Sequence, residues 1–164
     1  PKRISIEPLT KDLIIDFEIV YKNPLIRTRR KEFKLSNGNL NSIYNSRTFC
    51  LYEDIDQIKG QGLAKGGSLE NAIVVMGNKI LNEGGLRNRH EFVDHKILDC
   101  LGDLMLLGHR VFGHIKTSQG GHQLTHALLR EFFSNKTNWE FEGLGKKENN
   151  HKDGKYLGPI AVNA

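Results

Sequence analysis

Hydrophobic and polar residues alternate along the first third of the chain in the manner of β-strands. The alternation covers residues 4–6, 13–21 and 26–35, and Asn23 and Pro24 interrupt it with a turn. A period of two residues is typical of a strand with one buried and one solvated face. We therefore expect three strands in this part of the chain.

A glycine-rich segment separates these strands from the rest of the chain. A short helix at 39–45 and a strand at 47–52 lead into it, and two short apolar runs at 72–75 and 79–81 lie within it. Short apolar runs between glycine-rich turns indicate a small strand-containing unit. We interpret residues from about 51 to 87 as an insertion on the main sheet.

The hydrophobic period lengthens to that of an α-helix in the second half of the chain. The longest helical pattern covers residues 90–107, and a second covers 122–133 after a strand at 111–117. In the first helix one broad face is apolar and must pack against the core. That face is made by Val93, Ile97, Cys100, Leu101, Leu104 and Leu107.

The order of these elements indicates the fold class. Strands followed by helices without regular alternation are typical of an α+β layer structure. We predict a mixed sheet with two main helices packed on one face, a two-layer sandwich, plus the small insertion. We expect this domain to cover residues 1–143. Residues 144–164 should form a flexible polar tail, because they are charged and lack periodicity.

Composition narrows the class of protein without assigning a function. The 164 residues are 38% hydrophobic and 26% charged, as in a soluble domain, and no run of about 18 apolar residues occurs. Cys50 and Cys100 lie among apolar residues, which is typical of core cysteines in a reducing compartment, so we expect a cytoplasmic protein. The net charge of +5 suits an anionic partner. The basic cluster at 27–31 is either a solvated strand face or a binding patch.

One spacing on the longest helix suggests metal chemistry. His95 and Asp99 lie four residues apart, so a helix presents an imidazole nitrogen and a carboxylate oxygen on one face. Zinc accepts both ligand types, and a catalytic zinc usually has three protein ligands. The alternative is a surface pair that only supports the helix. Because apolar residues border this polar face, we expect another polypeptide segment to cover it.

A second candidate group lies at the start of the last helix. His122 follows Gly120 and Gly121, which let the backbone turn sharply and approach a substrate closely. A helix N-terminus disfavours a protonated histidine, so His122 would need a carboxylate partner, and Asp103 could be that partner. Such a pair is a common acid–base arrangement. From spacing alone, a capping or surface role for His122 is the simpler interpretation.

Several short motifs carry a combined pattern that is more specific than its parts. They are Arg47-Thr48-Phe49, Gly62-Leu63-Ala64-Lys65-Gly66-Gly67-Ser68, Asn82-Glu83-Gly84-Gly85-Leu86-Arg87, Glu91-Phe92-Val93-Asp94-His95-Lys96-Ile97-Leu98-Asp99 with Gly102-Asp103, and Gly121-His122. In this order and spacing they resemble the second domain of the UDP-3-O-acyl-N-acetylglucosamine deacetylases of bacterial lipid A synthesis. The resemblance covers residues 47–133, with a weaker similarity at 15–17.

The resemblance implies a reaction and a role for each group of residues. The reaction is zinc-assisted hydrolysis of the N-acetyl group of a UDP-linked, acylated glucosamine, with His95 and Asp99 as two of the three zinc ligands. Thr48 would hydrogen-bond the oxyanion, and His122, oriented by Asp103, would protonate the leaving amine. The implied substrate-binding residues are Lys96, Asp16 and Phe17 near the UDP portion, Phe49 near the sugar, and Ile55, Leu63, Ala72 and Val74 along an acyl-chain passage. These last four are equally compatible with core packing.

One departure from the family pattern limits what the chain does alone. In the family, the third zinc ligand and an adjacent glutamate base lie in a Thr-x-Glu-His segment of the N-terminal domain, and no such segment occurs here. His109, His114 and His126 lack that context. We therefore expect the chain to be the second half of a longer enzyme, to bind zinc poorly and to be inactive alone. Its partners would be the first half and the substrate, with no nucleic acid and no membrane span, although the acylated substrate would allow peripheral membrane contact.

Two other hypotheses remain open at this point. The basic charge is compatible with a non-catalytic nucleotide- or RNA-binding module, whose affinity would depend on salt and not on His95. The chain could also be an accessory hydrolase domain that gives two ligands to a different partner's metal. Metal analysis with an Asp99→Ala variant separates these two.

Overall fold

A five-stranded mixed sheet forms one layer of the protein. The computed structural model describes residues 1–142 and 160–163. The strand order is β3-β2-β7-β1-β8, and all neighbours are antiparallel except the parallel pair of β2 and β7. The bounds are Arg3–Pro8 for β1, Leu13–Ile19 for β2, Arg29–Lys34 for β3, Gly113–Ser118 for β7 and Ile160–Asn163 for β8. The strands predicted for β1, β2, β3 and β7 are confirmed.

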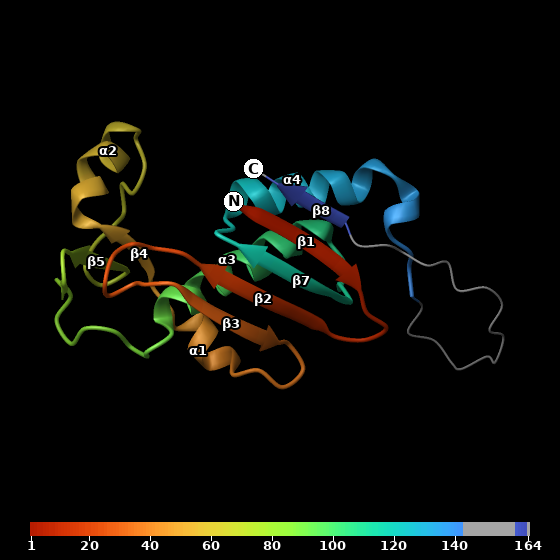
Figure 1. Ribbon diagram of the computed structural model, residues 1–164, viewed down its shortest axis with the longest axis horizontal. Helices are drawn as coiled ribbons and strands as arrows, with labels where there is room; N and C mark the ends of the chain where they lie inside the picture. Colours follow the sequence, from red (N-terminus) through yellow and green to blue (C-terminus); the bar gives the residue numbers. More distant parts are fainter. Residues whose placement is uncertain (143–159, 164) are drawn as a thin grey trace.

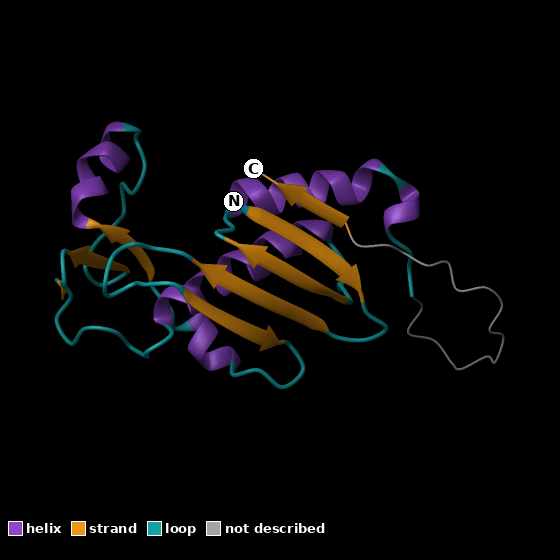
Figure 2. Cartoon of the chain, in the orientation of Figure 1, coloured by secondary structure: helices purple, strands orange, loops and turns teal. Residues whose placement is uncertain are grey.

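Two long helices cover one face of this sheet (Figure 1, Figure 2). They are α3, Glu91–Leu104, and α4, His122–Ser134. Buried strand residues such as Ile15 and Ile115 share one core cluster with Ile97 of α3. Burial of this apolar surface is the main favourable term in folding such a layer. The predicted α+β two-layer sandwich is confirmed.

Short helical segments complete the main layers. Helix α1, Leu40–Tyr44, begins after Asn39, whose side chain accepts a hydrogen bond from the Ser42 backbone N–H. The 3-10 turns η2, Met105–Leu107, and η3, Lys136–Asn138, follow α3 and α4. Within the described residues, none of the helices combines the length and the apolar character needed to cross a membrane.

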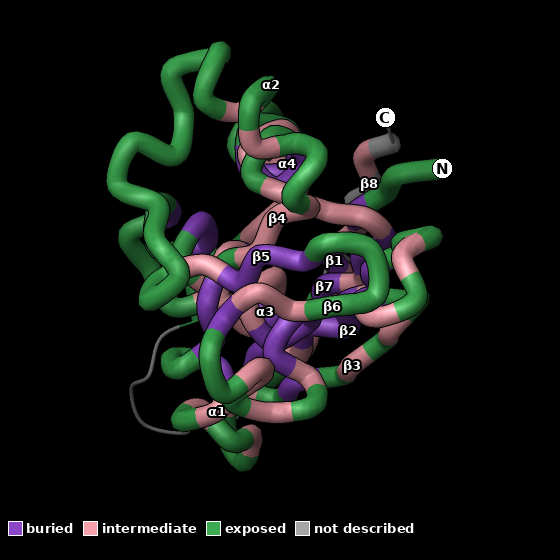
Figure 3. Tube along the Cα trace, turned by 90° about the vertical axis from the view of Figure 1, so that its left-hand side faces the viewer, coloured by how far each residue is buried: buried purple, intermediate pink, exposed green. Residues whose placement is uncertain are grey.

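The predicted insertion forms a second, small sheet beside one end of the main layers (Figure 1). Strand order is β4-β5-β6, with β4 parallel to β5 and β6 antiparallel to it. Its elements are β4, Thr48–Leu51, η1, Tyr52–Asp54, α2, Ile55–Gly60, β5, Ala72–Met76, and β6, Lys79–Ile80. Residues 61–71, which connect α2 to β5, are all exposed, as Figure 3 shows for this side of the molecule. The insertion therefore projects a solvated loop away from the core.

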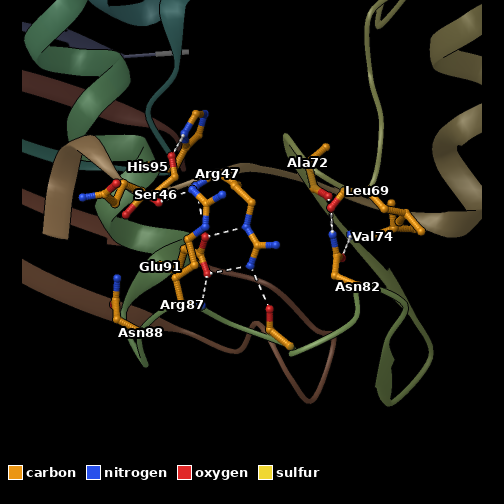
Figure 4. A network of polar contacts seen from close by, with 12 residues as sticks. Ser46, Arg47, Leu69, Ala72, Val74, Asn82, Arg87, Asn88, Glu91 and His95 are labelled. Carbon is orange, nitrogen blue, oxygen red and sulfur yellow. Dashed lines mark hydrogen bonds and ion pairs between the residues drawn. The ribbon is translucent and has the colours of Figure 1, made fainter.

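The side chain of Asn82, which follows β6, links segments of the small sheet through hydrogen bonds. Its side chain accepts a hydrogen bond from the Val74 backbone N–H at 2.9 Å and donates to the carbonyl oxygens of Ala72 and Leu69 at 2.7 and 2.6 Å (Figure 4). Asn82 is 5% exposed. One buried amide thus satisfies three backbone groups that the short strands leave unpaired.

The C-terminal end differs in part from the prediction. Most of the predicted tail at 144–164 lies outside the described residues. However, Ile160–Asn163 forms β8, which pairs antiparallel with β1. The expectation of an unstructured tail is wrong for these four residues. Their short apolar run is compatible with a strand, and β1 offers unpaired backbone groups on that side of the sheet.

Candidate active site

Four polar side chains form a continuous row where α3 and α4 meet. Asp99 lies between two histidines, with its Oδ1 atom 3.2 Å from His95 Nε2 and 3.8 Å from His122 Nε2. One turn further along α3, both oxygens of Asp103 lie 2.9 Å from His122 Nδ1. Both contacts expected from the sequence, His95 with Asp99 and Asp103 with His122, are present.

The Asp99 carboxylate is held in its charged form. Burial to 16% exposure would raise its pKa, but hydrogen bonds from His95 and Lys96 outweigh burial and lower the pKa to about 2. Lys96 Nζ donates to Asp99 Oδ2 at 2.7 Å, which leaves Oδ1 facing the two histidines. A charged carboxylate oxygen beside imidazole nitrogens is a donor set that suits zinc.

The ring of His95 is oriented from both sides. Its Nδ1 lies 3.2 Å from the backbone oxygen of Ser46, just before β4 (Figure 4). Because a carbonyl oxygen can only accept, Nδ1 donates this bond and Nε2 is the nitrogen directed at Asp99. A hydrogen bond from the non-ligating nitrogen is the usual arrangement around a histidine metal ligand. His95 and Asp99 therefore fit two positions of a metal site.

The turn from β7 into α4 brings His122 to this row. Gln119 has φ of 53°, in the left-handed region, and Gly120 follows it. A Cβ at Gly120 would lie 2.4 Å from Thr117 Oγ1 and 3.1 Å from Phe17 Cζ, so only glycine fits without displacing its neighbours. The prediction of a sharp turn ahead of His122 is confirmed.

Sequence reasoning missed one member of the cluster. His126 Nε2 lies 3.2 Å from Asp103 Oδ1, so Asp103 accepts hydrogen bonds from two histidines. Ligand atoms of Asp103, His122 and His126 lie within 4.8 Å of one another and could hold a metal ion. This grouping differs from the predicted ligand pair on α3. The four-residue spacing of His122 and His126 on α4 could have revealed it.

The residues expected near the nucleotide point to opposite faces of β2. Asp16 is 7% exposed and forms an ion pair with Arg30 on β3. Phe17 is 2% exposed and belongs to the core, with its ring against the β7–α4 turn. Only Asp16 therefore borders an open surface: a cavity of about 290 Å³ on the sheet, which residues such as Arg3, Lys116 and Ser118 also line.

The residues expected at the oxyanion and the sugar lie at the start of β4. Thr48 is exposed, two residues after the Ser46 carbonyl that contacts His95. Phe49 is partly buried between two aromatic rings, 5.6 Å from Tyr21 and 5.0 Å from Phe92 between ring centroids. Thr48 is thus free to meet a ligand, whereas Phe49 also anchors β4 on the core.

The four residues expected along an acyl passage differ in exposure. Leu63 is 57% exposed, Ile55 and Ala72 are partly buried, and Val74 is 8% exposed. Leu63 therefore offers the largest apolar surface to a ligand, while Val74 packs inside the small sheet.

The basic cluster at 27–31 is largely engaged within the protein. Arg29 donates to the carbonyl oxygens of Ile26, Leu25 and Arg89. Arg27 donates to the carbonyl oxygen of Pro24. Arg30 pairs with the carboxylate of Asp16, and Lys31 with that of Asp94 at 2.5 Å. Side chains that bridge structural elements in this way are less available to a polyanion, which weakens the nucleic-acid hypothesis.

The fold and the site together indicate a class of enzyme. A two-layer α+β unit whose helices present histidines and carboxylates in one row has the residue types from which metal-dependent and acid–base hydrolases build their active sites. A family model described as "UDP-3-O-acyl N-acetylglycosamine deacetylase" matches residues 1–134. The chain belongs to this family.

Curated relatives agree with this assignment. Proteins named UDP-3-O-acyl-N-acetylglucosamine deacetylase are similar over most of the chain. The one from Campylobacter jejuni subsp. doylei is 44% identical over 138 residues, covering 84% of this chain and 47% of the relative. The one from Actinobacillus pleuropneumoniae serotype 3 is 38% identical over 150 residues, covering 90% and 49%. The chain thus spans about half the length of the curated relatives it matches.

Proposed function

We propose that this chain supplies one half of a zinc-dependent deacetylase active site, which hydrolyses the N-acetyl group of a UDP-linked, 3-O-acylated glucosamine in lipid A biosynthesis. The observation that carries the proposal is the His95–Asp99 pair, 3.2 Å apart, with His95 Nδ1 bound to the Ser46 carbonyl. Membership of the family supports the type of reaction, because its curated members are named for it.

His95 Nε2 and Asp99 Oδ1 would be two ligands of the zinc ion. When bound, zinc polarises the acetamide carbonyl and lowers the pKa of a coordinated water. The third protein ligand and the general base would come from the half of the relatives that this chain does not span. Under this proposal, the two residues of α3 form only part of the zinc coordination sphere.

His122 would supply the proton for the leaving group. Its Nδ1 lies 2.9 Å from both oxygens of Asp103 and donates to that carboxylate, which orients the ring. Its Nε2 lies on the Asp99 side of the row, and the side chain is 60% exposed. From there Nε2 would give a proton to the amine nitrogen as the amide C–N bond breaks, which releases acetate and a free amino sugar.

Three further groups would position the substrate. Lys96 Nζ lies beside the β7–α4 turn, 4.0 Å from where a Cβ of Gly121 would be, and would attract the diphosphate. The exposed Thr48 hydroxyl would hydrogen-bond the oxyanion as it forms. Leu63, on the solvated loop of the insertion, would contact the acyl chain.

Site-resolved metal binding tests this proposal. Zinc added to the chain should perturb the ring resonances of His95 in NMR spectra, and His95→Ala or Asp99→Ala should remove saturable binding. His109→Ala is the matched control, because His109 is exposed and its ring packs against Phe141, away from the α3 row. Binding that survives both α3 substitutions would contradict the proposed ligand pair and would favour the group of Asp103, His122 and His126.

A further inference from the structure

A buried ion pair lies next to the proposed metal ligands without belonging to them. Arg47 and Glu91 have side chains that are 9% and 0% exposed. Glu91 Oε1 accepts from Arg47 Nε at 2.9 Å and from the Arg47 backbone N–H at 3.1 Å. Its Oε2 atom accepts from Arg47 Nη2 at 3.2 Å and from the Arg87 backbone N–H at 2.6 Å (Figure 4). One carboxylate therefore satisfies four donors from two segments.

This pair joins the helix of the metal ligands to the strand of the oxyanion group. Glu91 is the first residue of α3 and lies one turn before His95. Arg47 lies between Ser46, whose carbonyl accepts from His95 Nδ1, and Thr48, which begins β4. Three consecutive residues thus contact or flank the site, and the middle one is bound to α3 through Glu91.

The C-terminal end of the insertion, near residues 85–87, is bound to the same ion pair. Arg47 Nη2 also donates to the Gly85 carbonyl at 2.8 Å, and Arg87 Nη1 donates to the Asn45 carbonyl at 2.8 Å. Figure 4 shows Arg47, which precedes β4, reaching toward this loop while Glu91 projects from α3. The segments on both sides of the insertion therefore meet at a single buried carboxylate.

We infer that Arg47 and Glu91 are positioning residues that set the ring orientation of His95 by holding the Ser46 carbonyl in place. Ser46 itself is bound to α1, where its backbone N–H and hydroxyl donate to the carbonyl oxygens of Ile43 and Ser42. Among the described residues, the hydrogen bonds between this segment and α3, apart from the His95 bond, are those of Arg47 with Glu91, so Arg47 sets the position of the Ser46 carbonyl along α3. A histidine ring that loses its outer hydrogen bond binds a metal less well, typically by about 10- to 100-fold. The same pair fixes the start of β4, and with it Thr48. This inference rests on the proposed function, because it gives His95 the role of a metal ligand.

The test compares zinc affinity across matched variants of the chain. Zinc titrations followed on the His95 ring resonances measure binding at this site even when it is weak. Glu91→Gln keeps the side-chain shape but removes the charge that binds Arg47, and it should lower the affinity by about tenfold or more. Asp94→Asn is the control, because Asp94 is a buried carboxylate on the same turn of α3 that pairs with Lys31 and does not contact the Ser46–Thr48 segment.

Amide hydrogen exchange shows whether the variants remain folded. In Glu91→Gln, exchange should become faster at Arg47 and Arg87, which lose their acceptor, while the Ile15 and Ile115 amides in the central strands stay protected. If Glu91→Gln unfolds the chain, Arg47→Lys provides the second variant, since lysine keeps the charge and loses the two-point contact.

The outcomes separate the inference from the function on which it rests. Weaker zinc binding in Glu91→Gln or Arg47→Lys, with Asp94→Asn unchanged, supports the positioning role. Unchanged zinc affinity despite faster exchange at Arg47 makes the pair purely structural and overturns the inference. Equal loss of affinity in Asp94→Asn overturns it as well, because any damage to the first turn of α3 would then suffice. If saturable zinc binding survives in His95→Ala, the proposed metal site itself is wrong.

Discussion

Asp99 and Asp103 are two carboxylates on one helix that have different partners. Asp99 pairs with His95, Lys96 and, at 3.8 Å, His122, whereas Asp103 pairs with His122 and His126 of α4. Lys96 occupies one oxygen of Asp99 and leaves the other directed at the row. The difference in partners supports a ligand role for Asp99 and an orienting role for Asp103.

Asp103→Asn tests the orienting role at the residue scale. In the complete enzyme, the amide can no longer stabilise a protonated His122, so kcat should fall by about 100-fold or more while zinc content stays the same. His126→Ala is the comparison, because it removes the second histidine from Asp103 and leaves the His122 contact intact. Steady-state kinetics and metal analysis measure both effects. An equal loss in the two variants would show that Asp103 acts through the pair of histidines.

The charge of Glu91 predicts a pH dependence of stability. Burial alone would raise the pKa of Glu91, but hydrogen bonds from Arg47 and Arg87 lower it below its ordinary value of 4.5. A lowered folded-state pKa contributes stability that is present above the unfolded-state pKa and is lost as the pH falls through the folded-state value. Glu91→Gln should therefore cost about 3 kcal/mol at pH 7 and progressively less below about pH 4.5. Urea unfolding across this range measures the difference, and a constant gap would contradict the prediction.

Two glycines on neighbouring elements predict opposite changes in stability. Gly102 lies inside α3 with nothing within 4 Å of an added Cβ, so Gly102→Ala should stabilise the chain by about 1 kcal/mol through helix propensity. Gly120→Ala should destabilise it by about 1–3 kcal/mol, because the new Cβ would overlap Thr117 in the β7–α4 turn. Thermal unfolding of both variants checks the pair. A destabilised Gly102→Ala would mean that α3 is more crowded there than its contacts indicate.

The elements were predictable because their hydrophobic periods are regular. The apolar face of α3 was identified from residues such as Ile97 and Cys100, both fully or almost fully buried, and the turn at Gly120 from its glycines. The last strand, β8, was missed because four residues carry too little pattern to distinguish a strand from a tail. Short elements depend on the partner they pair with, and the partner is not visible in a local window.

Only those contacts of the site that depend on side-chain spacing along a helix could be predicted from the sequence. The contacts of His95 with Asp99 and of Asp103 with His122 follow from helical geometry and a single turn. The Ser46 carbonyl and the Arg47–Glu91 pair could not be predicted, because a backbone acceptor has no signature in sequence and the pair spans 44 residues of chain. The roles assigned to these residues remain predictions.

In the molecule as a whole, side chains beside the row of His95, Asp99, His122 and Asp103 are exposed to solvent and could be covered by a further polypeptide segment. His122 is 60% exposed, and Leu106 just past α3 is 69% exposed, although these elements carry the proposed chemistry. The chain spans about half the length of the curated relatives, and under the proposed function the part that it does not span would supply the cover and the third ligand. We therefore propose that the site is complete only when both halves are present.

Complementation measures that claim most directly. The chain would be assayed for deacetylation of the UDP-linked substrate with saturating zinc, first alone and then joined to the N-terminal half of the Campylobacter jejuni relative, with His95→Ala as control. We predict no turnover from the chain alone, turnover from the joined protein, and loss of that turnover in the His95→Ala variant. Turnover by the chain alone at the rate of the joined protein, or turnover that survives His95→Ala, would contradict this prediction.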